Sequence, residues 1–180
     1  MENFVECWID ALNKTYIANV KVSDVNNWDI SPLFPSVPKK DLFKPIDNPE
    51  FWNNVKPLDG SVEYIKRLID DGHEVYVVTA SHPNTVKPKL EKVLRVYFPY
   101  IPYKNVIIAH NKQMIKGDIL IDDAPHNLIG GDYLKLLMTA QHNLGFDAIE
   151  NDMIRVDSWE HAYRVISDIA ERYIDRETEE

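Results

Sequence analysis

The chain has 180 residues, a net charge of −9 and a hydrophobic content of 44%. This hydrophobic content is enough to build the core of one folded domain. The acidic balance argues against a nucleic-acid or membrane partner, because either would need a basic surface. The single cysteine, Cys7, excludes an internal disulfide and fits a reducing cytoplasm, where we place the protein. No apolar run approaches the roughly 20 residues of a membrane-spanning helix.

The N-terminal third of the chain is predicted to be helical. Residues 3–17 carry apolar side chains at helical spacing and predict an amphipathic helix. Residues 19–57 then mix proline, asparagine, aspartate and aromatic residues without a steady period. We expect this segment to form a small helical cap, because its aromatic side chains need burial or a ligand.

From residue 58 onward, predicted strands and helices alternate. The expected strands cover residues 74–81, 105–110, 118–123, 133–140 and 153–159. The expected helices cover residues 61–73, 84–98 and 159–173, followed by a solvated tail at 175–180. This alternation predicts an α/β fold, a Rossmann-like parallel sheet sandwiched by helices. The predicted core therefore spans 1–18 and 58–180, and the cap spans 19–57.

Polar side chains stand where three of the predicted strands end. Thr79 closes one strand, Lys112 follows the next, and Asp122 and Asp123 close the third. The carboxyl ends of parallel strands share one edge of a sheet, so these groups are expected to meet. A hydroxyl and an ammonium bind phosphoryl oxygens, and carboxylates bind Mg²⁺ through oxygen. The sequence thus predicts a phosphate and magnesium site.

Each of these residues also has a purely structural interpretation. Asp122 and Asp123, followed by Pro125, would suit a turn or a helix cap, and Lys112 would suit the surface. Thr79 is β-branched and would suit any strand. What favours a site is the order Thr, Lys, Asp-Asp at consecutive strand ends, which differs from the order in response-regulator receiver domains.

This order resembles that of the 5′(3′)-deoxyribonucleotidases, magnesium-dependent phosphatases of the haloacid dehalogenase-like superfamily. The matching stretches are FWNNVKPLDGSVEYIKRL, VYVVTAS, NKQMIKGDILIDD, LLMTAQHN and RVDSWEHAYRVI, within residues 51–166. The resemblance implies an enzyme that hydrolyses a nucleoside monophosphate to nucleoside and phosphate, with Mg²⁺ as cofactor. It implies that the protein does not bind polymeric nucleic acid. Whether the protein forms a homodimer is left open by the resemblance.

The resemblance also implies roles for the residues that contact phosphate. Thr79 corresponds to the hydroxyl that binds the phosphoryl group, and the backbone N–H of Ala80 contributes to the same site. Relatives often carry a serine where Ala80 stands, so one hydroxyl is lost. Lys112 corresponds to the lysine that neutralises nucleophile and phosphate. His110 stands where relatives often carry an arginine.

Metal and substrate contacts follow from the same resemblance. Asp123 corresponds to the direct magnesium ligand, and Asp122 orients the site as its neighbour. Phe51 and Trp52 correspond to cap aromatics near the nucleotide base, with plain cap core as the alternative. The stretch TAQHN at 139–143 matches the family as well, but the resemblance assigns it no chemistry.

The first motif of the superfamily, Asp-x-Asp on the first strand, supplies the attacking aspartate and the general acid. No stretch of residues 1–180 matches it, and relatives place it directly before a helix similar to residues 2–16. We expect a longer form of the protein or a homologous partner to supply this strand, and residues 1–180 alone to be nearly inactive. The alternatives are a non-catalytic nucleotide- or phosphate-binding protein, and a phosphatase for another small phosphorylated metabolite.

Overall fold

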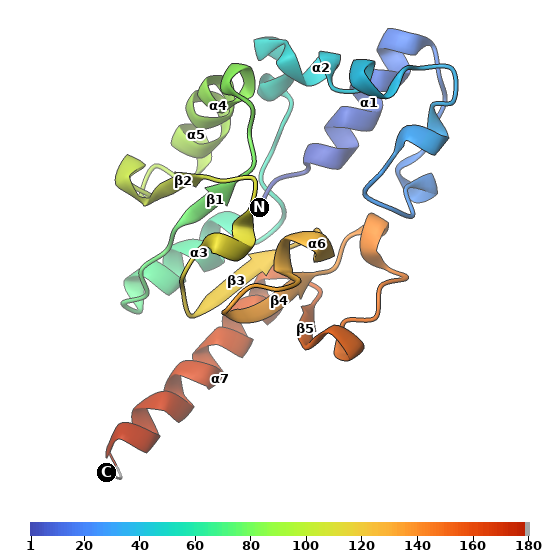
Figure 1. Cartoon of the computed structure of the whole chain (residues 1–180). Helices are drawn as coiled ribbons and strands as arrows, with labels where there is room; N and C mark the ends of the chain where they lie inside the picture. Colours follow the sequence, from blue (N-terminus) through green and yellow to red (C-terminus); the bar gives the residue numbers. More distant parts are fainter. Residues whose placement is uncertain (179–180) are drawn as a thin grey trace.

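The computed structural model describes residues 1–178 and confirms the α/β class, with parallel strands flanked by helices (Figure 1). The strands are β1 Val77–Thr79, β2 Val106–Ile108, β3 Ile119–Asp122, β4 Leu134–Met138 and β5 Met153–Val156. The helices are α1 Phe4–Tyr16, α2 Lys44–Asp47, α3 Ser61–Asp70, α4 Pro83–Lys89, α5 Arg95–Tyr97, α6 Pro125–Leu128 and α7 Trp159–Thr178. Within the described residues, no helix has the length and apolar character to cross a membrane.

The five predicted strands are all present, but they are divided between two parallel sheets. β1 pairs with β2, and β3, β4 and β5 form a second sheet in that order. Within residues 1–178, β1 and β3 are not paired with each other, so one edge of each remains open. This division of the expected single sheet creates the cleft described below.

Strand β4 shows how the second sheet is held between two layers of helices. Leu136 and Met138 belong to a buried cluster that includes residues of α3 and α7. Leu137 points to the opposite face and packs with Leu128 of α6. Successive side chains of a strand alternate between faces, which explains this division. Complete burial of each such side chain contributes roughly 1.5–3 kcal/mol.

The helix predicted over 84–98 is present, but it is irregular. α4 is followed by a π-helical segment, Leu90–Leu94, and then by α5. Pro88 lies inside α4, where it has no N–H to donate and crowds the preceding turn. In the wider turn that follows, Val93 faces the cluster around α1, whereas Leu94 faces the cluster of α3 and α7.

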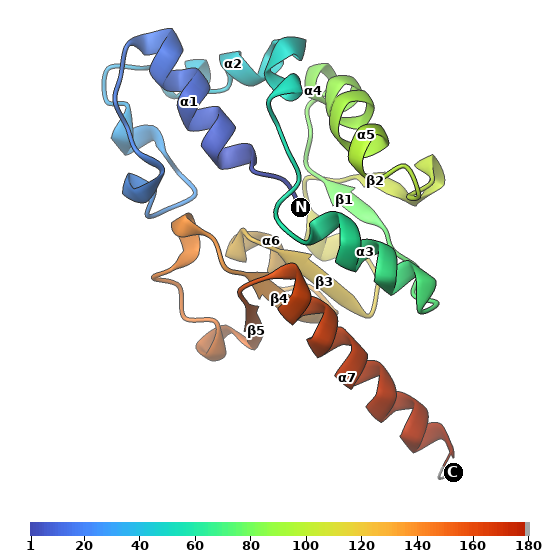
Figure 2. The same ribbon diagram turned by 180° about the vertical axis from the view of Figure 1, so that it is seen from behind.

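The predicted cap lies with α1 at one end of the molecule, and α7 extends away at the other (Figures 1 and 2). The buried side chains of α1 share one hydrophobic cluster with the segment 25–55: Trp8, Ile9, Leu12, Val25, Ile30, Phe34, Val37, Leu42, Ile46, Phe51, Trp52 and Val55. Of the predicted tail, residues up to Thr178 continue α7, and residues 179–180 lie outside the described residues. The boundaries of core and cap, 1–18 and 58–180 against 19–57, stay predictions.

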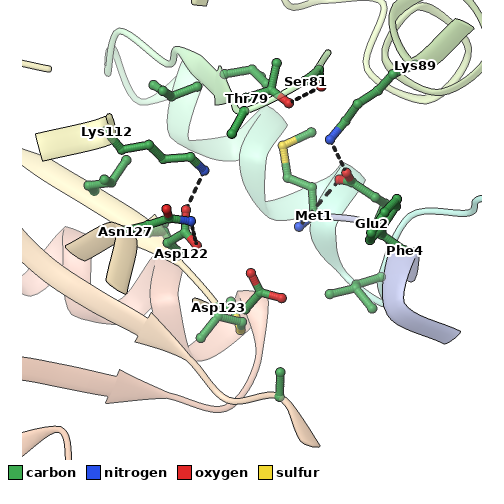
Figure 3. A pocket seen from close by; sticks show the side chains of 18 of the residues that line it. Met1, Glu2, Phe4, Thr79, Ser81, Lys89, Lys112, Asp122, Asp123 and Asn127 are labelled. Carbon is green, nitrogen blue, oxygen red and sulfur yellow. Dashed lines mark hydrogen bonds and ion pairs between the residues drawn. The ribbon is translucent and has the colours of Figure 1, made fainter. Parts of the chain in front are cut away.

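Residues 1–3 and residues 56–58 run side by side between this end of the molecule and the sheets. The Asn3 N–H donates to the Lys56 carbonyl (3.0 Å), and the Leu58 N–H donates to the Met1 carbonyl (2.7 Å). Glu2 and Pro57 form an antiparallel bridge between them. These contacts bring the Glu2 side chain close to the carboxyl end of β1 (Figure 3).

Candidate active site

A cleft of about 1250 Å³ lies between the two sheets. Its walls include the apolar side chains of β1 and β3, such as Val77 and Ile121, and Leu68 of α3. The cleft is therefore apolar in its depth, and polar side chains gather where the strands end (Figure 3).

The structure brings most of the predicted site residues to this one cleft. Those that line it are Thr79, Ala80, Lys112, Asp122, Asp123 and Trp52. We call Thr79, Lys112, Asp122 and Asp123 the rim residues. Phe51 is not among the lining residues and packs in the cluster behind Trp52. The convergence of the rim residues was expected from the direction of parallel strands alone.

Asp122 is buried, and both of its carboxylate oxygens have partners. Oδ2 accepts from the Lys112 ammonium at 2.5 Å. Oδ1 accepts from the Ala124 N–H at 2.9 Å and from the Asn127 amide at 3.0 Å. These partners balance the buried charge, so Asp122 holds Lys112 and the start of α6 in place.

Asp123 has a different environment, although it is the next residue. Its side chain is 44% exposed and points away from Asp122, into the cleft (Figure 3). The His142 ring lies beside it, with Nε2 at 3.6 Å from Oδ2. Burial within the cleft, and then the negative charge of Asp122, raise the pKa of Asp123. Asp123 is therefore a carboxylate that a bound cation would stabilise.

This arrangement fits a magnesium ion held in part by ligands other than protein side chains. Among residues 1–178, no three histidine, cysteine, aspartate or glutamate side chains converge as a metal site. Mg²⁺ usually takes only one or two carboxylates from the protein, and it completes its shell with water and substrate phosphate. Asp123 would supply such a carboxylate, with Asp122 held beside it by Lys112.

Ser81, which was not among the residues predicted from the sequence, places a second hydroxyl beside that of Thr79. Ser81 Oγ lies 2.9 Å from Thr79 Oγ1, and both residues line the cleft. Side chains two residues apart in an extended segment point to the same side. The spacing of Thr79 and Ser81 was thus a signal that could have identified the pair. Two hydroxyls can donate to neighbouring phosphoryl oxygens.

Glu2 is a second residue that the sequence analysis did not identify. It accepts from the Lys89 ammonium at 2.7 Å, and its side chain is 12% exposed. Burial raises the pKa of Glu2, but Lys89 and the N-terminal ammonium outweigh this effect and lower the pKa to about 2. Lys89 also lies over the Trp52 ring, 5.8 Å from its centre. A lone glutamate gives no sequence signal for such a pair, which forms only when α4 packs beside residues 1–3.

The aromatic residues of the predicted cap occupy different positions. Phe51 and Trp52 are buried, and the Trp52 indole donates to the Ile46 carbonyl at 3.0 Å. Trp28 lines the cleft and remains 39% exposed. Its ring contacts the rings of His142 (5.2 Å between centres) and His126 (5.7 Å). Phe43 also lines the cleft and is 42% exposed, so Trp28 and Phe43 are exposed cap aromatics at the cleft, whereas substrate contact by Phe51 and Trp52 stays a prediction.

His110 lies beside His82 at the end of the first sheet. Their ring centres are 5.5 Å apart, and both residues line the cleft. Two imidazoles therefore take up the side of the cleft next to Thr79, where relatives often carry an arginine. Each neutral imidazole has one donor and one acceptor nitrogen, so the pair can also donate to phosphate.

Comparisons with known proteins identify one family. Residues 1–173 match the family model described as 5′ nucleotidase, deoxy (pyrimidine), cytosolic type C protein (NT5C). Proteins named 5′(3′)-deoxyribonucleotidase from Bacillus subtilis (strain 168) and Bacillus phage SPbeta are each 36% identical over 159 residues, which is 87% of this chain and 87% of theirs. A protein of the same name from Clostridium acetobutylicum is 30% identical over 158 residues, 86% of this chain and 83% of its own.

Replacing Asp123 by asparagine is expected to stabilise the metal-free protein. The pKa of Asp123 is higher in the folded protein than in the unfolded chain, so the protonated side chain favours folding. This contribution is complete below the unfolded pKa and is lost as the pH rises through the folded pKa. Asp123→Asn removes a charge that repels Asp122 and should raise the melting temperature at pH 7 in EDTA by about 2–4 °C. Scanning fluorimetry at pH 4 and pH 7 measures this, with exposed Asp132→Asn as control. A lower melting temperature for Asp123→Asn at pH 7 would contradict the environment described here.

Replacing Glu2 by glutamine is expected to have the opposite effect. It leaves Lys89 without its charged partner and should lower the free energy of unfolding at pH 7 by ~1–3 kcal/mol. Because the pKa of Glu2 is lowered to about 2, its contribution is present above the ordinary value of 4.5 and is lost as the pH falls toward 2.

Urea unfolding at pH 7 and at pH 3 measures this difference, and exposed Glu91→Gln serves as the control. The difference between the wild type and Glu2→Gln should shrink at pH 3. An equal difference at both values would show that the Glu2 side chain acts through packing and not through its charge.

Proposed function

The chain belongs to the 5′ nucleotidase, deoxy (pyrimidine), cytosolic type C protein family, and from this we propose that it hydrolyses deoxyribonucleoside monophosphates with magnesium bound at Asp123. By its family it is a nucleotide phosphomonoester hydrolase. The observation that carries the finer proposal is the meeting of Thr79, Lys112 and Asp123 at one cleft.

The substrate phosphate would lie among the rim residues. The hydroxyls of Thr79 and Ser81 would donate to phosphoryl oxygens, together with the backbone N–H of Ala80. The Lys112 ammonium, oriented by Asp122, would neutralise their negative charge. A group fixed in this way needs little reorganisation as charge develops in the transition state.

Magnesium would be held by Asp123, water and the substrate phosphate. When bound, it supplies Lewis-acid stabilisation of the phosphoryl charge. The chain itself presents the half-exposed carboxylate of Asp123 directly after β3. The neighbouring carboxylate of Asp122 is paired with Lys112.

We further propose that the attacking aspartate belongs to a strand that lies in the cleft between β1 and β3. Three features support this: β1 and β3 each have an open edge in the described residues, both run parallel to their neighbours, and the walls between them are apolar. A parallel strand seated there would pair with both and join the two sheets. Its carboxyl end would then lie beside the rim residues.

The carboxylate of Glu2 is a poor alternative to this aspartate, although it also lies at the cleft. Lys89 and the N-terminal ammonium hold its charge, and its pKa is about 2. Because the Lys89 ammonium lies 2.7 Å from this carboxylate, attack on phosphorus would have to break the ion pair.

The proposed reaction has two steps. A carboxylate oxygen of the aspartate forms a bond to phosphorus, the bond to the ester oxygen breaks, and a second aspartate gives its proton to the leaving nucleoside. Water then attacks the phosphorus of the phosphoaspartate and passes a proton to the second aspartate. Inorganic phosphate leaves, and both carboxyl groups return to their starting states.

Strand complementation tests this proposal. We expect residues 1–180 alone to bind deoxyuridine monophosphate in the presence of magnesium, with almost no turnover. A synthetic peptide of alternating aliphatic residues ending in Asp-x-Asp should bring phosphate release, and the same peptide ending in Asn-x-Asn should not.

Each result of this assay has a definite meaning. Robust turnover without the peptide would place the nucleophile within residues 1–180. Nucleotide binding without turnover, with every peptide and in every longer form, would favour the non-catalytic binding protein. Turnover of another phosphomonoester in preference to deoxynucleotides would favour the metabolite phosphatase.

The two tryptophans of the cap should respond differently to truncation. If the base stacks on Trp28, Trp28→Ala should weaken deoxyuridine monophosphate binding by ~1–3 kcal/mol and leave the melting temperature nearly unchanged. Trp52→Ala should instead cost ~3–5 kcal/mol of stability, because it empties a buried position. Calorimetric titration and thermal unfolding separate these effects. Weaker binding by stable Trp52→Ala, with Trp28→Ala unaffected, would place the base at Phe51 and Trp52.

A further inference from the structure

The loop after β4 holds the backbone of Asp123 through Asn143. The Asn143 side chain is buried, and its amide group donates to the Asp123 carbonyl (2.7 Å) and to the Met138 carbonyl (2.8 Å). Its Oδ1 accepts from the Ala140 N–H at 3.1 Å. The side chain thus joins the end of β4 to the residue after β3.

Arg155 on β5 fixes Asn143 from behind. Its Nη1 donates to Asn143 Oδ1 at 3.0 Å. Its Nη2 donates to the carbonyls of Asn143 (3.2 Å) and Phe146 (2.7 Å). With these contacts both donors and both acceptor positions of the Asn143 side chain are used, so the amide has one orientation.

His142 contacts Asp123 from the same loop. Its Nε2 lies 3.0 Å from the Asp123 carbonyl, which can only accept, so this nitrogen carries the proton. Nε2 is also 3.6 Å from the carboxylate, and Trp28 packs edge-on against the ring. The Asp123 carbonyl therefore receives two side-chain donors, from consecutive residues that lie far along the chain.

We propose that Asn143 and His142 are positioning residues that aim the Asp123 carboxylate into the cleft. A carbonyl held by two donors fixes the backbone torsion of its own residue, and hence the direction of the side chain. Such a restraint is needed here, because the neighbouring charge of Asp122 would otherwise favour turning Asp123 toward water. Groups that orient a metal ligand typically contribute 10–100-fold to metal affinity. The consequence for metal binding rests on the proposed function, whereas the consequence for the backbone does not.

Two variants test the inference, with one matched control. Asn143→Ala removes one donor, and His142→Phe removes the other while keeping a ring beneath Trp28. Asn105→Ala is the control, because the Asn105 amide also donates to a backbone carbonyl, that of Val75, which lies two residues before β1. Amide hydrogen exchange of segments 119–128 and 75–82 and calorimetric titration with MgCl₂ are measured on all four proteins.

For Asn143→Ala and His142→Phe, we expect faster exchange in 119–128, unchanged exchange in 75–82, and magnesium dissociation constants about tenfold higher. Asn105→Ala should show faster exchange in 75–82 and wild-type magnesium affinity. Wild-type exchange in 119–128 in both variants, or equal acceleration in both segments, would overturn the positioning role. If the wild type itself binds no magnesium, the metal assignment fails, and the exchange pattern alone still decides the positioning role.

Discussion

The separation of two adjacent negative charges governs the arrangement around the cleft. Asp122 and Asp123 follow one another at the end of β3, and like charges in a poorly hydrated position repel strongly. The fold separates their roles. Asp122 turns inward to Lys112, Ala124 and Asn127, whereas Asp123 turns into the cleft with its carboxylate half exposed. One residue is thereby structural and the other available to a cation.

This separation depends on the segments that follow β2, β3 and β4. Lys112 comes from the turn after β2, and Asn127 comes from the first turns after β3. The Asp123 carbonyl is held from the opposite side by the loop that follows β4. Asp123 is thus fixed on both sides by segments that meet only because consecutive parallel strands end at the same edge. The sheet therefore fixes the positions of the loops that carry these side chains.

The cleft between β1 and β3 combines two kinds of lining. Its rim carries hydroxyls, an ammonium and a carboxylate that suit a phosphate, and its depth is lined by apolar strand residues that suit a strand. Open strand edges leave backbone groups unpaired, which is costly when they are shielded from water. A strand seated in the cleft would pair with the open edges of β1 and β3 and would cover the apolar lining. The same strand would bring its carboxyl end to the rim residues.

Periodicity and local chemistry were sufficient to predict much of this molecule. All five strands, the helix at α1 and the final helix follow from spacing, because burying one face of an element imposes its period on the sequence. The rim residues Thr79, Lys112, Asp122 and Asp123 could be placed together because alternating strands and helices predict parallel strands, whose carboxyl ends share one edge. Ser81 was within reach of the same reasoning, since it lies two residues from Thr79.

Other features required the folded chain. The pairing of Glu2 with Lys89, the exposure of Trp28 against the burial of Phe51 and Trp52, and the contacts of Asn143 with Asp123 and Arg155 all join distant segments. Residue type and spacing do not encode such pairs. The sequence by itself determined the α/β class and the chemistry of the rim, because these depend on local periods and on strand ends. Tertiary structure alone decided what holds Asp122 toward Lys112 and the backbone of Asp123 in place, because those contacts exist only once the strands and loops have packed.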